Sequence, residues 1–278
     1  MRQALRWVPH DFFLAVRFLT RIPAPFGPCA AVQRAAEGPA EGAAAQDITA
    51  ERLAGATRFF PVVGGIIGLA TAGSSIVFNL VLPPLPAAAL TLAAWIYVTG
   101  AMHLDGLMDS ADGLLSHRGR ERALEIMKDS GTGPMGVVAG ISVLLVKVAA
   151  IASLGGAGAV AGLVVAPIVG RTSMVFCLAL FPYARKDGMG AFSSRLSGSA
   201  ILAPAIFGML LVVAAGGPAG AATLAITVAA ACAASSGVSG FLGGLTGDVY
   251  GAICEISEAA ALVLWLALRD TLGGAPWM

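Results

Sequence analysis

The chain has 278 residues, of which 57% are apolar and only 12% charged, and its mean hydropathy is +0.83. Soluble domains are about 45–50% apolar and about 25% charged, so these values exclude an ordinary soluble protein and indicate a polytopic membrane protein. The formal net charge of +1 argues against a nucleic-acid partner, because such a partner requires a basic surface.

The first 58 residues predict a cytoplasmic or interfacial segment rather than a membrane span. Residues 7–22 combine aromatic and aliphatic side chains with charges such as Asp11 and Arg21, so we expect an amphipathic helix in the membrane interface or beneath the bundle. Pro23 ends this helix, because proline cannot continue helical hydrogen bonding. Residues 27–46 are rich in Ala, Gly, Pro and Glu and predict a loop.

From residue 59 onward, apolar runs follow one another closely, and each is near the roughly 20 residues needed to cross a bilayer. We therefore predict an all-α fold, a polytopic helical bundle over residues 59–268, in a single integral membrane domain that takes in residues 1–278. The seven predicted spans are Phe59–Leu82, Pro86–His103, Pro134–Leu154, Ala157–Phe181, Ser199–Gly216, Ala219–Leu242 and Val249–Leu268.

Basic residues predict the orientation of the bundle. Of the 17 Lys and Arg residues, 14 lie in the N-terminal segment or in the loops after the second and fourth predicted spans. The turns at 83–85, 155–156 and 217–218 contain none. The positive-inside rule therefore places the basic loops in the cytoplasm, with the chain in the bacterial cytoplasmic (inner) membrane and its active site facing the cytoplasm.

The end of the second predicted span carries an acidic motif, His103–Gly113 (HLDGLMDSADG). Spacings of four and three put Asp105, Asp109 and Asp112 on one face if the segment is helical, where they repel by a few tenths of a kcal/mol per pair. A bound cation would relieve this repulsion, and Mg²⁺ fits best because it prefers carboxylate and phosphate oxygens. The alternative is a solvated loop with ordinary charges. No second His or Cys lies near His103 in sequence, which argues against zinc.

A second acidic set begins the last predicted span. Spacings of seven and three put Asp248, Glu255 and Glu258 on one helical face, and the two glutamates fall inside the apolar segment. Carboxylates at that depth need partners, and Lys147 and Arg171, also inside apolar runs, are candidate counter-ions. These residues either serve the reaction or form buried ion pairs that fix helix register.

Two sets of glycines flank these acidic segments. Glycine lets the backbone approach a ligand closely and present its N–H groups to anionic oxygens, so a phosphate is one candidate ligand. Close packing of membrane helices is the alternative explanation. The two sets are Gly131, Gly133 and Gly136, and Gly243, Gly244 and Gly247.

Five ordered motifs resemble the cobalamin synthase family of adenosylcobinamide-GDP ribazoletransferases, from about Phe12 to Glu258. One position departs from the family pattern, because Gly131 stands where the family usually has an arginine; a phosphate-binding role of that arginine would pass here to Arg171, Arg185 or Lys128. The motifs are FLTRIPAP from Phe18, the acidic motif, LEIMKDS from Leu124, YAR from Tyr183 with GMG from Gly188, and GGLTGD from Gly243.

The resemblance implies a transferase that joins α-ribazole, or its 5′-phosphate, to adenosylcobinamide-GDP and releases GMP. The product is adenosylcobalamin or its 5′-phosphate, in the nucleotide-loop assembly step of vitamin B12 biosynthesis. With Mg²⁺ as the cofactor, the expected metal ligands are Asp105, Asp109, Asp112 and Asp248. The expected catalytic residues are Asp105, Asp109, Asp248 and Glu255. The expected substrate contacts are Arg21, His103, Lys128, Ser130, Arg171, Arg185 and Thr246.

Two alternatives stay open at this level. A CDP-alcohol phosphotransferase of phospholipid synthesis also uses an Asp-rich helix end, but its motif is not reproduced around Ser116 and Lys128. A polytopic transporter would also explain seven spans with charged residues inside them, although transporters place such residues near the bilayer midplane rather than at helix ends. Membrane lipid is the expected environment, and a homo-oligomer is left open.

Overall fold

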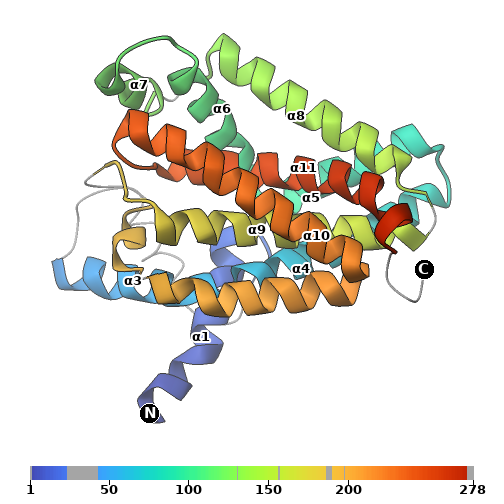
Figure 1. Cartoon of the computed structure of the whole chain (residues 1–278), viewed down its shortest axis with the longest axis horizontal. Helices are drawn as coiled ribbons and strands as arrows, with labels where there is room; N and C mark the ends of the chain where they lie inside the picture. Colours follow the sequence, from blue (N-terminus) through green and yellow to red (C-terminus); the bar gives the residue numbers. More distant parts are fainter. Residues whose placement is uncertain are drawn as a thin grey trace.

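The computed structural model describes residues 2–23, 43–129, 131–155, 157–185, 190–196 and 198–273. These residues form a helical bundle without β-strands, in which the only β-type pairing is an isolated bridge between Tyr183 and Leu245 (Figure 1). The predicted all-α fold class is therefore confirmed.

The N-terminal segment forms α1 (Arg2–Leu19), α3 (Ala43–Ala56) and the short 3₁₀ helix η1 (Thr57–Phe59). α1 is amphipathic, as predicted: Ala15 and Leu19 are fully buried, and Asp11 forms an ion pair with Arg58 of η1. Most of the predicted loop at 27–46 lies outside the described residues, and its last four residues belong to α3.

The remaining helices build the bundle around α9, which packs against α4, α10 and α11. Branched and small apolar side chains of α9, such as Leu163, Val165 and Ile168, are fully buried. The helices are α4 (Phe60–Asn79), α5 (Pro84–Thr99), α6 (Met102–Leu114), α7 (Arg120–Ile126), α8 (Pro134–Ser153), α9 (Ala157–Leu180), η2 (Ala191–Arg195), η3 (Gly198–Ile201), α10 (Leu202–Leu242) and α11 (Gly247–Leu272).

Among the described residues, five helical segments are long and apolar enough to cross a membrane, and the bent pair α5–α6 would make a sixth. The five are Ala50–Asn79, α8, most of α9, α10 and α11. The predicted count of seven exceeds this number, because the prediction divides α10 into two spans and takes α5 as a complete one. The polytopic class holds. The count of five or six treats α10 as one segment, and dividing α10 at its break at Gly217 gives the further segment that the prediction contains.

The second predicted span, Pro86–His103, is not a single helix. α5 ends at Thr99, and Gly100 and Ala101 both have positive φ, at 69° and 61°. α6 then starts at Met102 and runs at 92° to α5. The acidic motif is thus helical, as predicted, but α6, of 13 residues, is too short to be a span by itself and leaves the direction of α5.

The predicted boundary at residues 217–218 has a structural counterpart inside α10. Gly217 has φ 58° and ψ −147°, far from helical values, and Pro218 follows it. Only glycine adopts this conformation readily, and proline adds a residue with no N–H donor. The chain reverses direction there, so the two parts of α10 run in opposite directions (Figure 1).

The loops of the bundle are divided between its two ends (Figure 1). One end holds α6 and α7, the connection after α9, and the turn between α10 and α11. The other end holds the turns after α4 and α8 and the break in α10. All the sequence motifs that suggest chemistry belong to the first end, apart from the buried charges inside the bundle.

Glycines on α4 allow close contact with α9. A Cβ atom at Gly64 would lie 2.5 Å from the carbonyl oxygen of Pro167, and one at Gly68 would lie 2.6 Å from the Cα atom of Val164. These distances are shorter than any tolerated contact, so both positions require glycine for the observed packing. Gly73, on the same helix, has no atom within 4 Å of its Cβ direction.

We expect Gly64→Ala to lower stability by about 1–3 kcal/mol, because the added methyl group forces α4 away from α9. Gly73→Ala is the matched control, since alanine favours helix there by about 1 kcal/mol and meets no neighbour. Thermal unfolding of the two purified variants in detergent measures the difference. Equal unfolding temperatures for the two variants would contradict the α4–α9 packing.

Candidate active site

Three aspartates from two distant segments of the chain lie together at one end of the bundle. Asp105 and Asp109 come from α6, and Asp248 comes from the first turn of α11. α6 and α11 approach closely because glycines face the contact: a Cβ at Gly106 would lie 2.8 Å from the carbonyl oxygen of Asp248, and one at Gly251 would lie 3.0 Å from that of His103. We call Asp105, Asp109 and Asp248 the acidic site.

The carboxylates of the acidic site repel one another. Partial burial, followed by the charges of Asp105, Asp248 and Asp112, raises the pKa of Asp109 to about 6, and Arg185 counteracts this only in part. At neutral pH Asp109 is ionised at a cost in free energy, and a cation bound at the site would recover that cost. The three carboxylates therefore form a negatively charged site open to a cation.

Arg185 lies against the acidic site. Its Nη1 atom is 2.9 Å from Oδ2 of Asp248, while its Nη2 donates to the carbonyl oxygen of Leu124 at 3.5 Å. Backbone hydrogen bonds bring Arg185 there, because Ala184 N donates to Leu245 O and Leu245 N donates to Pro182 O, each at 2.8 Å. These bonds tie the segment after α9 to the turn before α11. The prediction did not pair Arg185 with Asp248, since nothing in their sequence spacing indicates it.

The same turn sets the start of α11. Gly243 and Gly244 have φ of 74° and 145°, which glycine adopts without strain. Thr246 caps α11: its hydroxyl accepts from Val249 N at 3.3 Å and donates to Asp248 Oδ2 at 3.3 Å. Thr246 is fully buried, so the structure gives this predicted substrate contact the role of a cap that orients Asp248.

Asp112 does not share the surroundings of Asp105 and Asp109, the other two aspartates of the acidic motif. Its Oδ2 accepts from Gly133 N at 2.6 Å and its Oδ1 accepts from Gly136 N at 2.8 Å, so it binds the N-terminus of α8. A Cβ at Gly133 would lie 2.5 Å from Oδ1 of Asp112, which explains the glycine. Two of the glycines predicted as phosphate contacts, Gly133 and Gly136, thus donate to an aspartate of the same chain, and both oxygens of Asp112 accept a hydrogen bond.

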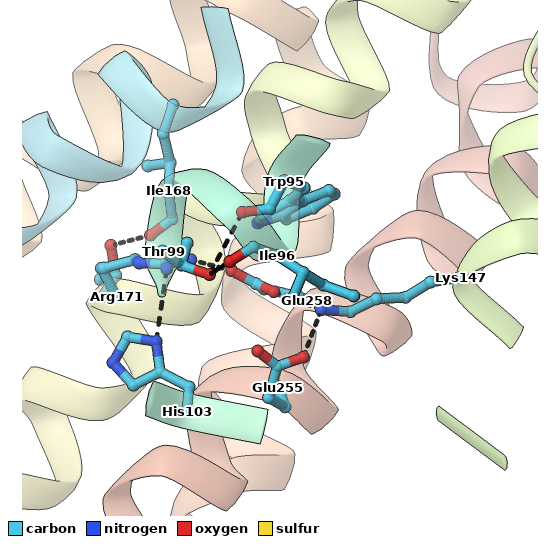
Figure 2. Close-up of polar contacts among 10 residues, drawn as sticks. Trp95, Ile96, Thr99, His103, Lys147, Ile168, Arg171, Glu255 and Glu258 are labelled. Carbon is cyan, nitrogen blue, oxygen red and sulfur yellow. Dashed lines mark hydrogen bonds and ion pairs between the residues drawn. The ribbon is translucent and has the colours of Figure 1, made fainter. Parts of the chain in front are cut away.

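A neutral ion-pair network lies inside the bundle, farther along α11 than Asp248 (Figure 2). Lys147 of α8 pairs with Glu258 and, at 2.5 Å, with Glu255, both of α11; Arg171 of α9 also pairs with Glu258. Arg171 and Glu258 are 0% exposed and Lys147 is 2% exposed. The prediction of Lys147 and Arg171 as counter-ions is confirmed. Glu255, which is also predicted as a catalytic residue together with Asp248, is a member of this buried network.

His103 and Trp95 extend the network to two further helices. Nδ1 of His103, in the first turn of α6, is 3.4 Å from Nη2 of Arg171, and the ammonium group of Lys147 lies 4.7 Å from the ring centroid of Trp95 on α5. The side chains of the network come from α5, α6, α8, α9 and α11, and Figure 2 shows them pointing toward one another. The network therefore fixes α6 and α11 relative to the centre of the bundle.

Comparison with known proteins decides the family. The profile described as cobalamin-5-phosphate synthase matches residues 11–266, nearly the whole chain. This chain belongs to that family. Proteins named adenosylcobinamide-GDP ribazoletransferase are similar to it: the one from Brevibacillus brevis is 40% identical over 91% of this chain and 96% of its own length. Those from Roseiflexus sp. and Pseudomonas paraeruginosa are 36% and 37% identical, over 89% and 95% of this chain and 86% and 98% of their own lengths. No solved structure matches.

The donor set of this family member fits Mg²⁺ in type and charge. In the described part of the chain, no three His, Cys, Asp or Glu side chains are arranged as a ready metal site. Mg²⁺ is usually held by one or two carboxylates together with substrate phosphates, and it keeps several waters. The mutually repelling Asp105 and Asp109 offer such carboxylates, whereas the oxygens of Asp112 are already hydrogen-bonded.

The other predicted substrate contacts lie in different surroundings. Arg21 is exposed. Its backbone N–H donates to Val98 O at 2.8 Å, and its side chain packs against Gly100 at the α5–α6 break. Lys128 is exposed just after α7. Ser130 lies outside the described residues. Arg171 is completely buried in the ion-pair network, so of the three candidate replacements for the missing family arginine, only Arg185 touches the acidic site.

The different roles of Asp112 and Asp105 predict opposite effects on stability. Asp112→Ala removes the acceptor for two N–H groups of α8, and we expect a loss of about 1–3 kcal/mol. Asp105→Ala removes an exposed charge from a repelling set, and we expect unchanged or higher stability. Thermal unfolding without added metal measures both. A loss at Asp105 equal to that at Asp112 would contradict these assignments.

Proposed function

We propose that this family member transfers an adenosylcobinamide phosphoryl group from adenosylcobinamide-GDP to α-ribazole or α-ribazole 5′-phosphate, releasing GMP. The observation that carries the proposal is the convergence of Asp105 and Asp109 of α6 with Asp248 and Arg185 at one end of the bundle. The printed name of the similar proteins, adenosylcobinamide-GDP ribazoletransferase, supplies the substrate class. The reaction is then the nucleotide-loop assembly step of vitamin B12 biosynthesis.

The reaction requires one phosphorus–oxygen bond to form and another to break. A ribose hydroxyl of the ribazole attacks the phosphorus attached to cobinamide, the bond to the bridging oxygen breaks, and GMP leaves with that oxygen. Such a displacement depends on positioning and on neutralising the charge of the phosphoryl oxygens. Oδ2 of Asp248 is held by Arg185 and Thr246, so Oδ1 is the atom that accepts the proton of the attacking hydroxyl.

Arg185 supplies the fixed positive charge. Its guanidinium has five N–H donors, and two contacts, with Asp248 and Leu124, leave donors for a phosphate oxygen. A cavity of about 560 Å³ lies beside it, lined by residues that include Tyr183, Ser193 and Leu196. Space for a bulky diphosphate substrate thus adjoins Arg185, which in turn contacts Asp248 of the acidic site.

Asp105 and Asp109 would hold Mg²⁺ in the loaded enzyme. A bound Mg²⁺ neutralises the charge of a diphosphate and helps to orient it. Asp109 interacts with both of the other carboxylates, because the charges of Asp105 and Asp248 each raise its pKa. We therefore assign Asp109 as the metal ligand whose loss matters most, and assign Asp112 a structural role at the start of α8.

The alternatives receive no support from the site. The charged residues inside the bundle, which a transporter would use for its pathway, are paired with one another as Lys147, Arg171, Glu255 and Glu258. The family match covers nearly the whole chain and is not to CDP-alcohol phosphotransferases. A ribazoletransferase is the function that the geometry and the relatives support together.

Asp109→Asn should abolish most activity while the protein still folds. Loss of the central carboxylate should lower kcat by about 100-fold or more, because electrostatic stabilisation of the diphosphate is lost. The measurement is GMP release from adenosylcobinamide-GDP with α-ribazole and Mg²⁺ in detergent. Asp270→Asn, at an exposed carboxylate of the last turns of α11, is the control and should retain full activity. Activity of Asp109→Asn within a few-fold of wild type would remove Asp109 from the site.

The proposed orientation, with the acidic site facing the cytoplasm of the inner membrane, predicts a labelling pattern. In a cysteine-free background, Lys128→Cys should react with a membrane-impermeant maleimide only after the cells are made permeable. Gly155→Cys, at the opposite end of the bundle, should react in intact cells. Both native positions are exposed, so access to the reagent depends on the side of the membrane. The reverse pattern would overturn the orientation.

A further inference from the structure

An aromatic pocket adjoins the acidic site. It is a cavity of about 90 Å³ whose walls include Phe18, Phe60, Phe192 and Tyr250, from α1, α4, η2 and α11. Phe18 stacks on Phe60 with ring centroids 5.9 Å apart and meets Phe192 edge-on at 6.1 Å. We use the name aromatic pocket for this cavity. Sequence patterns gave no sign of it, because its walls come from segments far apart in the chain.

The pocket has one polar end. Asp105 and Asp248 line it together with Gly247 and Gly251, so a molecule in the pocket extends directly to the acidic site. Apart from His103 and the hydroxyl of Tyr250, the rest of the lining is mostly apolar: besides the aromatic rings it includes Met102, Met174 and Leu178. A ligand with a flat apolar part and a polar part matches this division.

His103 brings an unused hydrogen-bond donor to the pocket. It lines the pocket, is only 3% exposed, and its Nε2 atom has no hydrogen-bond partner. The Arg171 guanidinium next to Nδ1 can only donate, so Nδ1 is the acceptor and the proton of the neutral ring is on Nε2. Nε2 lies on the side of the ring away from Arg171 (Figure 2). A buried donor without a partner is costly, which indicates an acceptor on a ligand.

Among the chemical groups of the two substrates, the base of the ribazole matches the aromatic pocket best. The base of α-ribazole is a dimethylbenzimidazole, which is flat and apolar and, once attached to ribose, has a single ring nitrogen free to accept a hydrogen bond. Guanine carries several donors and acceptors, and those that do not reach His103, Tyr250 or the two aspartates would be left unpaired against the apolar walls, which is unfavourable. The corrin ring is far larger than the cavity.

We propose that the aromatic pocket binds the base of the ribazole, with His103 Nε2–H donating to its free ring nitrogen and the ribose reaching Asp105 and Asp248. The inference rests on the proposed transfer reaction and adds the position of the acceptor substrate to it. A cavity of about 150 Å³ holds benzene, so the pocket must widen for the bicyclic base. Met102 and Met174 are flexible walls that permit this.

The first test uses the wild-type enzyme and two acceptors of the same shape. One is α-ribazole, and the other is its indole analogue, in which a C–H group replaces the free ring nitrogen. We expect the KM for the indole analogue to be about 10-fold higher or more, because it leaves His103 without an acceptor. Equal KM values for the two acceptors would overturn the proposal without any change to the protein.

The second test uses two variants of His103. Asn places its amide near the position of Nδ1 and retains a group for Arg171, but has nothing at Nε2; Gln carries an amide group to about the position of Nε2. His103→Asn should raise the KM for α-ribazole to that for the indole analogue, and His103→Gln should restore at least part of the preference. The KM for adenosylcobinamide-GDP should stay unchanged, and thermal unfolding shows whether each variant is folded.

The outcomes separate this inference from the proposed function. Absence of GMP release by the wild-type enzyme with either acceptor would defeat the transfer reaction itself. Transfer with an undiminished preference for α-ribazole in folded His103→Asn would place the base elsewhere and leave the reaction standing. A rise in the KM for adenosylcobinamide-GDP alone would assign the pocket to guanine and overturn the inference. Met174→Trp, which fills the cavity, should raise the KM for both acceptors.

Discussion

Glu258 is the residue on which the arrangement of the bundle depends. It is completely buried on α11 and pairs with Lys147 of α8 and Arg171 of α9, while Lys147 also pairs with Glu255. Two cations and two anions make the network neutral, which a low-dielectric interior requires. Removing one member would leave an uncompensated buried charge, and such changes cost about 3–5 kcal/mol. The relative positions of α8, α9 and α11 are therefore fixed by charge as well as by packing.

The position of the acidic site depends on this ion-pair network. Asp248 lies in the first turn of α11, two turns before Glu255, so anchoring the glutamates also anchors the aspartate. α6 is tied to the same network through His103 and Arg171 and lies against α11 at Gly106 and Gly251. Like charges of the acidic site can stay close because the neutral network holds their helices in place. The repulsion that results is what makes the site suited to a cation and a diphosphate.

Local patterns predicted much of this structure. Apolar runs located the helices, the spacing of Asp105 and Asp109 predicted a shared face, and charges inside apolar runs predicted the partners of Glu258. Contacts between distant segments were not accessible in the same way. Arg185 meets Asp248 through backbone hydrogen bonds between two loops, and Asp112 turns to α8 because glycines there let it approach. The break after Thr99 was missed because hydropathy continues smoothly across Gly100 and Ala101.

The network also has a consequence for the order in which the chain assembles. Lys147 and Arg171 are synthesised well before the two glutamates that neutralise them. A charged side chain at the centre of a membrane helix costs about 2.5–3.5 kcal/mol on insertion scales. Until α11 arrives, the nascent bundle therefore holds two basic groups that lack these carboxylates. Insertion of α11 brings the two glutamates that neutralise Lys147 and Arg171. The native core and the acidic site therefore form in the same late step.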